Sequence, residues 1–287
     1  MVYVRSKVVK GEKYLYLVKS VWDAKKNTSR QETVKYLGKV SEITRDDIPP
    51  EYRNNPKITS FLSSEESLPM ADKERLIQKL RQQFYRCLIK ADFDGCKNLY
   101  EDYSSKSGHV SFFERILNPV MYQIGDDWEN GRISVAEEHV ASNISNTLVR
   151  IIRDKNAEPP RKMKIVICTP EGEEHVLGPL VLETHIASLG HKVYNLTAQA
   201  PHNSITSFIE ANKPDAVFVS VTLPDSIKPA QRLVRKIRQL SETSIFVGGQ
   251  ALQNQPSLDF GDAQIVVESS LKDIPKLLTR KMSVRTK

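Results

Sequence analysis

The sequence predicts a multidomain protein in which a small β-rich module and a four-helix bundle precede a doubly wound α/β domain with a parallel sheet. Three observations lead to this prediction. β-branched and aromatic runs alternate with turn residues at the N-terminus, apolar residues recur every three or four positions in the middle, and strand-like and helix-like segments alternate towards the C-terminus. The expected parts are a basic β-rich module at 1–45, a linker at 46–69, a helical bundle at 70–158 and an α/β domain at 161–287.

The N-terminal module combines strand patterns with a concentration of positive charge. Residues 2–4, 14–18 and 33–37 have strand composition, with turn-like segments between them, so we expect a small antiparallel sheet. Residues 1–40 carry ten basic and three acidic residues, and this excess equals the net charge of +7 of the whole chain. Such a block favours a polyanionic partner, with nucleic acid the first candidate and a merely solvated face the alternative. The segment resembles the N-terminal β-hairpin module of one transposase family, without that family's catalytic core.

The middle of the chain is expected to be helical. Prolines, asparagines and serines break any periodic pattern over 41–69. Asp72 is expected to cap a first helix that extends to 89, and a second helix is expected from about Asp92. A third is expected over 110–128 with a kink at Pro119, and a fourth over 135–152.

The α/β domain is predicted from a regular alternation. The expected strands are 163–168, 192–196, 216–220, 244–247 and 264–267. The expected helices are 178–189, 202–212, 225–240 and 271–279. Because ligands of such sheets bind at the carboxyl ends of the strands, the loops that follow the strands are the first place to look for a site.

The loop after the first of these strands places a histidine at the ligand-binding edge. It lacks the Gly-rich pattern of dinucleotide loops and is not a phosphate-binding P-loop. Imidazole is a good ligand for borderline metals such as cobalt, and Glu173, two residues before His175, could accept a hydrogen bond from the other ring nitrogen. Gly178 would allow a bulky group to approach. A solvated loop histidine is the alternative interpretation. We expect no such role for the other histidines of this domain, His185, His191 and His202.

Three segments on successive strand–helix units resemble the pattern of the cobalamin-binding domain, D-x-H-x-x-G, then S-x-L or S-x-T, then G-G. The matching residues are Glu173, His175, Gly178, Ser220, Thr222, Gly248 and Gly249. The resemblance implies a flavodoxin-like domain in which the histidine replaces the cofactor's own benzimidazole base as the lower ligand of cobalt. It also implies that Ser220 and Thr222 hydrogen-bond the displaced nucleotide tail, while Gly248 and Gly249 make room for it.

A second motif lies in the helical region, where nine residues separate Trp128 from the pair Glu138-His139. On general grounds Trp128 would be a core anchor and Glu138-His139 surface positions. The spacing, however, resembles the W-x9-E-H signature of light-sensing, adenosylcobalamin-dependent repressors. That resemblance implies that Trp128, Val135, Glu138 and His139 cap the upper adenosyl group, so that the cofactor lies between the helical and α/β domains. It also implies that light cleaves the cobalt–carbon bond and changes the oligomer.

The chain departs from those repressors in two places. Glu129 follows Trp128 where the repressors carry a histidine, which puts a photoproduct ligand from that position in doubt. The basic β-rich module stands where the repressors have a helix-turn-helix domain. Glu173 replaces the aspartate of most cobalamin-binding domains, as it does in the light-sensing subgroup.

Three functions follow from these patterns. The first is a cobalamin-dependent sensor, a photoreceptor with adenosylcobalamin, which turns over no substrate, forms a light- or ligand-dependent homo-oligomer and controls nucleic-acid binding. The second is a corrinoid carrier of methyl groups with methylcobalamin. The third is a cobalamin-free nucleic-acid-binding protein with a degenerate α/β domain.

A cytoplasmic location without membrane contact is expected, because the sequence contains neither an apolar run of membrane-spanning length nor a signal peptide pattern. The cysteines Cys87, Cys96 and Cys168 are not spaced as a metal site or a disulfide framework, which indicates buried thiols in a reducing compartment.

Overall fold

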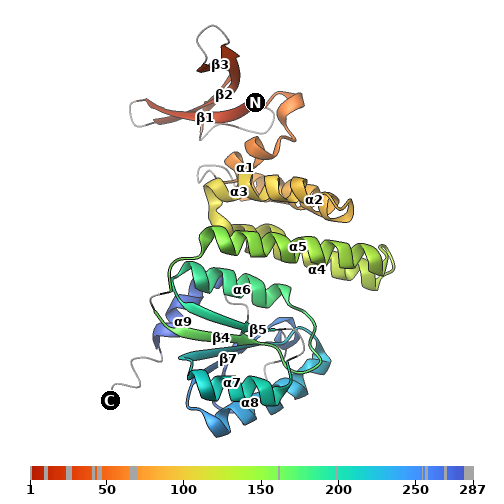
Figure 1. Cartoon of the computed structure of the whole chain (residues 1–287). Coiled ribbons are helices and arrows are strands. Elements are labelled where there is room, and N and C mark those ends of the chain that lie inside the picture. Colours follow the sequence, from red (N-terminus) through yellow and green to blue (C-terminus); the bar gives the residue numbers. More distant parts are fainter. Residues whose placement is uncertain are drawn as a thin grey trace. The chain divides into compact units, whose positions relative to one another are not determined.

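The computed structural model of the chain forms two compact units, residues 1–144 and 145–287 (Figure 1). The residues that it describes are 2–9, 12–23, 28–40, 43, 47–64, 70–160, 162–197, 200–253, 255, 258–267 and 270–280.

The N-terminal unit begins with a three-stranded antiparallel sheet in the order β1-β2-β3, which confirms the predicted module. Its strands are β1 (Val2–Val9), β2 (Glu12–Asp23) and β3 (Thr28–Lys39). Leu15 and Leu17 on β2 and Val4 on β1 are buried in one hydrophobic cluster with Ile58 and Phe61. The sheet therefore has one face in a core, which a small sheet requires for stability.

The segment expected to be a linker supplies part of this core. Residues Pro56–Ser64 form helix α1, and Ile58 is fully buried. The prediction that 41–69 contains no periodic element was therefore wrong for this stretch. A nine-residue helix offers too short a periodic pattern to stand out among the flanking prolines and serines, and contact with the sheet stabilises it.

Four helices follow, as predicted, with different boundaries. They are α2 (Met70–Ile89), α3 (Phe93–Phe112), α4 (Asn118–Glu129) and α5 (Val135–Asn156). Helix α2 begins before Asp72, so this residue lies in its first turn and not at the cap. Helix α3 is kinked at Gly108, whose φ of +74° only glycine adopts readily, so the boundary expected between the second and third helices lies inside α3. A π-helical turn, Phe113–Leu117, joins α3 to α4. Pro119 lies in the first turn of α4, where proline is tolerated, and not at a mid-helix kink.

Two of these helix starts follow local capping rules. The Asp92 carboxylate accepts a hydrogen bond from the backbone N–H of Gly95 at 2.8 Å, as an N-cap of α3. Ser134 and Glu137 form a reciprocal capping box at the start of α5, where the Ser134 N–H donates to Glu137 at 2.7 Å. Helix α5 therefore begins at Val135, as predicted.

The C-terminal unit contains a five-stranded parallel sheet in the order β5-β4-β6-β7-β8. The strands are β4 (Lys164–Cys168), β5 (Lys192–Leu196), β6 (Ala216–Ser220), β7 (Ser244–Gly248) and β8 (Gln264–Val266). The helices are α6 (Leu177–Ser188), α7 (His202–Asn212), α8 (Ile227–Leu240) and α9 (Ile274–Arg280). Helices α6 and α9 pack on one face of the sheet, and α7 and α8 on the other (Figure 1). This is the doubly wound arrangement that the sequence predicts.

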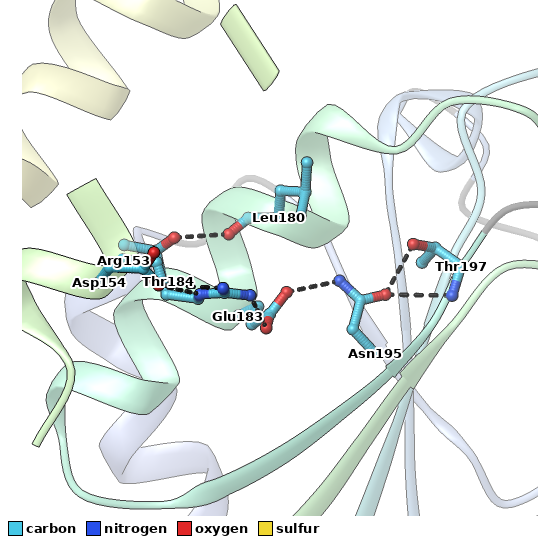
Figure 2. Close-up of polar contacts among 7 residues, drawn as sticks. All are labelled: Arg153, Asp154, Leu180, Glu183, Thr184, Asn195 and Thr197. Atoms are coloured by element: carbon cyan, nitrogen blue, oxygen red, sulfur yellow. Dashed lines mark hydrogen bonds and ion pairs between the residues drawn. The ribbon is translucent and has the colours of Figure 1, made fainter. Parts of the chain in front are cut away.

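The second half of α5 belongs to this C-terminal unit and is joined to it by polar contacts (Figure 2). Arg153 donates to the buried carboxylate of Glu183 on α6 at 2.9 Å. The other oxygen of Glu183 accepts from Asn195 at the end of β5 at 2.7 Å, and Asn195 in turn accepts from Thr197. A charged pair and an amide thus connect α5, α6 and β5.

No helix in the described part of the chain is both long and apolar enough to cross a bilayer.

Candidate cofactor site

The carboxyl ends of three neighbouring strands bring the expected site residues to one edge of the sheet. Strands β4, β6 and β7 end at Cys168, Ser220 and Gly248. Strand β5 lies on one side of β4, and the next strand along the chain, β6, lies on the other side, so the strand order switches between β4 and β6. Doubly wound sheets bind ligands at such a switch point. The loop after β6 is fixed to β7, because the N–H of Val221 donates to the carbonyl of Gly248 at 2.8 Å.

Glu173 links the histidine loop to the loop after β6. One carboxylate oxygen lies 2.7 Å from Nδ1 of His175 and also accepts the backbone N–H of His175 at 3.1 Å. The other oxygen accepts the backbone N–H groups of Thr222 and Leu223 at 2.9 and 3.0 Å. The side chain is fully buried, yet each of its oxygens has two donors. Glu173 therefore fixes the position of the histidine relative to β6.

The ionisation state of the Glu173 carboxylate determines which ring nitrogen of a neutral His175 carries the proton. Burial acts to raise the pKa of Glu173, but the hydrogen bonds from His175, Leu223 and Thr222 outweigh it and lower the pKa to about 2. An ionised carboxylate can only accept hydrogen bonds, so Nδ1 of a neutral His175 carries the proton. The lone pair is then on Nε2, which is the atom that can ligate a metal.

The His175 side chain is 52% exposed, so this loop presents its imidazole to the surface of the unit. Among the described residues, no group of three or more histidine, cysteine or acidic side chains could hold a metal ion by itself. The donor set therefore fits a metal that arrives with most of its ligands already in place and takes one imidazole from the protein.

The glycines at this edge have two different physical roles. A Cβ on Gly249 would lie 2.1 Å from the carbonyl oxygen of Val221, and one on Gly248 would lie 2.8 Å from that of Val266. The fold itself thus requires glycine at both positions. At Gly178 the nearest atom to an added Cβ is Ser220 Oγ, at 3.9 Å. Packing within the protein does not require glycine there, which fits the close approach of a bulky group.

One residue of this site, His202, was not expected from the sequence. His202, the first residue of α7, is buried, and its Nε2 accepts the backbone N–H of Glu171 at 3.0 Å. Burial lowers the pKa of His202, which favours the neutral acceptor. It therefore holds the start of the loop that carries His175. His202 lies 31 residues after Glu171 in the sequence, so no local pattern indicates this contact.

The helical residues singled out by spacing lie on the surface of the N-terminal unit. Trp128 is 45% exposed and Val135 is 52% exposed, so Trp128 is not a core anchor. The carboxylate of Glu138 lies 2.5 Å from Nδ1 of His139 and also accepts the hydroxyl of Ser142 at 2.6 Å. Trp128, Val135 and the imidazole of His139, which Glu138 orients, are thus exposed. Glu129 is also exposed.

Family comparison identifies the class of protein that this fold and this loop define. Two family models match the chain, each described as a B12 binding domain, one over residues 80–153 and the other over residues 163–270. Together they cover the helical region and the α/β region. The chain therefore belongs to the proteins that carry these B12-binding domains, and its cofactor is a cobalamin.

Individual relatives fall into two groups. The chain is 27% identical over 150 residues to the HTH-type transcriptional repressor CarH of Myxococcus xanthus, and the match covers 51% of this chain and 49% of the repressor. It is 25% identical over 175 residues to the repressor CarA of the same organism, covering 60% and 58%. It is 21% identical over 188 residues to dimethylamine corrinoid protein 3 of Methanosarcina acetivorans, covering 63% and 85%. The chain thus spans about half the length of the two repressors.

A solved structure shows the same fold. The Methanosarcina barkeri monomethylamine corrinoid protein superposes with a TM-score of 0.59 at 13% identity, over 71% of this chain and 99% of that protein. This likeness confirms the succession of a helical region and a parallel five-stranded α/β domain.

Proposed function

We propose that the chain is a cobalamin-dependent sensor that responds to light and controls nucleic-acid binding through its N-terminal module. The observation that carries the cobalamin part of this proposal is the oriented pair of His175 and Glu173 at the switch point of the sheet. The similarity to two repressors, over 150 and 175 residues, favours regulation over turnover.

In this proposal Nε2 of His175 is the lower ligand of cobalt. Glu173 holds the proton on Nδ1 and orients the ring, while His202 fixes the start of the loop. The hydroxyls of Ser220 and Thr222, next to the glycine pair, hydrogen-bond the displaced nucleotide tail. The exposed face of Gly178 gives the corrin ring access to the imidazole.

In this proposal four residues of the N-terminal unit also bind the cofactor: Trp128, Val135, Glu138 and His139. Trp128 and Val135 are exposed, so both side chains are accessible to a ligand. When bound, adenosylcobalamin supplies a cobalt–carbon bond that light can cleave. Residue 129 offers a carboxylate and no imidazole, so we expect the response after illumination to differ from that of the repressors.

The experiment is to load the protein with adenosylcobalamin in the dark, illuminate it, and record the visible spectrum and the oligomeric state. We expect both to change, and we expect His175→Ala to bind without the spectrum of an imidazole-ligated cobalt. Trp128→Ala should weaken retention of adenosylcobalamin. Its matched control is Tyr122→Ala, because Tyr122 is an equally exposed aromatic residue (48%) on the same helix. An unchanged spectrum and size after illumination would refute the photosensor.

The second candidate is a corrinoid carrier in methyl transfer. The match to the dimethylamine corrinoid protein, which covers 85% of that protein, favours it. Preferential retention of methylcobalamin, and methyl transfer to a thiol acceptor once a partner methyltransferase is added, would support the carrier and count against the sensor. The cobalamin-free alternative is disfavoured by the two family matches.

A further inference from the structure

We infer that the outward face of the N-terminal sheet binds single-stranded nucleic acid by stacking bases on its aromatic rings. The inference rests on the proposed function in one respect, that the output of the protein is nucleic-acid binding, and it specifies the surface and the form of the nucleic acid. Strand register, ring geometry and charge carry it.

Strand register assigns the residues of the sheet to two faces. Leu15 and Leu17 of β2 face the core. Residues on β2 that alternate with them point to the other side, together with their cross-strand partners on β1 and β3. The aromatic face defined in this way contains Tyr14, Tyr16, Trp22 and Tyr36, with Tyr3, Arg5 and Lys7 on β1 and the buried Val18 between Tyr16 and Trp22.

Tyr14, Tyr16 and Tyr36 form a cluster of rings on this face, in which Tyr14 and Tyr16 are half-buried and Tyr36 is exposed. Tyr16 and Tyr36 are directly paired across the strands, with ring centroids 5.1 Å apart, and Tyr14 lies 6.4 Å from Tyr36. Tyr36 is nevertheless 52% exposed, and Trp22, further along β2, is 63% exposed. Rings held by a sheet offer flat surfaces at little cost in side-chain entropy, which is the property that base stacking needs.

Cations flank the tyrosines on both neighbouring strands. On β1, Arg5 pairs with Tyr16 and Lys7 pairs with Tyr14, and on β3, Lys39 pairs with Tyr14. The Arg5 guanidinium is hydrogen-bonded to Gln31, whose amide donates to the Tyr3 hydroxyl at 2.6 Å.

The acidic residue at the rim of this face is Glu12, which is already paired with Lys39 and accepts the Tyr14 hydroxyl. Alternating rings and cations match the alternating bases and phosphates of a nucleic-acid strand.

Single strands fit this surface better than a duplex does. In a duplex only the edges of the bases are accessible, so flat rings cannot stack on them, whereas unpaired bases can be laid on an aromatic sheet. A two-stranded β-ribbon can also enter the major groove of a duplex, and binding of that kind would depend on cations and not on the rings. Comparison of single and double strands therefore decides between the two modes.

The test measures fluorescence anisotropy of labelled single-stranded DNA and RNA oligonucleotides, and of the corresponding duplexes, with the full chain. We expect the single strands to bind more tightly. Tyr36→Ala should weaken their binding by about 5- to 100-fold, as expected for one lost stacking interaction, while Tyr36→Phe should retain it. Tyr122→Ala, on α4, is the aromatic control and should bind like the parent.

Salt dependence tests the cations separately. Lys7→Gln should reduce the slope of log affinity against log salt by about 0.7. Lys19→Gln provides the matched control, because Lys19 is an exposed lysine of the same sheet that pairs with Val2 on the opposite face.

Tighter binding of the duplex, or equal single-strand binding by Tyr36→Ala and Tyr36→Phe, would overturn the inference, as would no binding at all. Each measurement is made with and without cobalamin. If the chain binds single strands but neither binds cobalamin nor responds to light, the proposed sensor is refuted, while the inference about the aromatic face stands.

Discussion

The carboxylate of Glu173 is the group whose removal tests the candidate site most directly. Its pKa falls from 4.5 to about 2 in the folded protein. At ~1.36 kcal/mol per pKa unit, this corresponds to about 3 kcal/mol of folding stability. Because the folded-state pKa is the lower of the two, that stability is present above a pH of about 4.5 and is lost as the pH falls towards about 2.

Glu173→Gln keeps the shape of the side chain but replaces one acceptor oxygen with an amide donor. Either His175 or the backbone N–H groups of the loop after β6 must then face a donor, so buried hydrogen-bonding groups lose their acceptor. We expect the variant to lose about 3 kcal/mol of stability at neutral pH. Its stability should also no longer decline between pH ~4.5 and ~2 on account of this group.

Urea unfolding of the cofactor-free chain at several pH values measures both effects. Far-UV circular dichroism is the appropriate signal, because both tryptophans, Trp22 and Trp128, lie in the N-terminal unit and would not report on the unit that contains Glu173. Glu171→Gln is the matched control, since Glu171 is an exposed carboxylate of the same loop. Parallel pH profiles for the parent and Glu173→Gln would refute the assignment of this stability to the carboxylate.

Three further predictions concern single contacts. Gly249→Ala places a methyl group against the carbonyl of Val221 at a φ of +131°, so we expect a loss of about 3 kcal/mol or more, measured as a lower Tm. Tyr85→Phe removes a 2.8 Å hydrogen bond to buried Asp127 and should cost about 1 kcal/mol in urea unfolding. Burial and Asp127 raise the pKa of Tyr85 to about 12, so the phenylalanine variant should show less late tyrosine ionisation than the parent in an ultraviolet titration. His202→Leu leaves a loop N–H without its acceptor and should weaken hydroxocobalamin binding about tenfold in a spectroscopic titration.

Each of these has an outcome that would contradict it. An unchanged Tm for the alanine variant would show that the backbone at residue 249 shifts freely. Late tyrosine ionisation of the same amplitude in the parent and in the phenylalanine variant would show that Tyr85 does not contribute to it. Equal cobalamin affinity with and without His202 would mean that the loop is positioned by Glu173 alone.

The α/β domain was predicted well because its pattern is local. Each buried parallel strand is a short apolar run bounded by turn residues, as in residues 164–168 and 216–220, and the strict alternation with helices determines the sheet type. The pair of Glu173 and His175 could also be proposed from sequence, because the two residues are close together in one loop. In contrast, the donors Thr222 and Leu223 are about fifty residues away and follow from the fold alone.

The features missed by the sequence analysis depend on contacts between distant segments. Helix α1 is stabilised by packing against the sheet and against α2 and α3, so the short pattern around Ile58 gave little indication of it. His202 acts through its ring on a distant backbone group, and no spacing rule reports such a contact.

The contact between Arg153 and Glu183 determines where the chain can be cut. A fragment that begins near residue 160, where the strand pattern of the α/β domain starts, would lack Arg153 and leave Glu183, only 8% exposed, without its cationic partner. Because the Arg153 side chain is itself 31% exposed, the loss of this pair costs on the order of 1 kcal/mol. A fragment that begins at Ser145 keeps the second half of α5 and this pair. For expression, crystallisation or grafting onto another output module, the end of a helix is therefore part of the cofactor-binding domain that follows it.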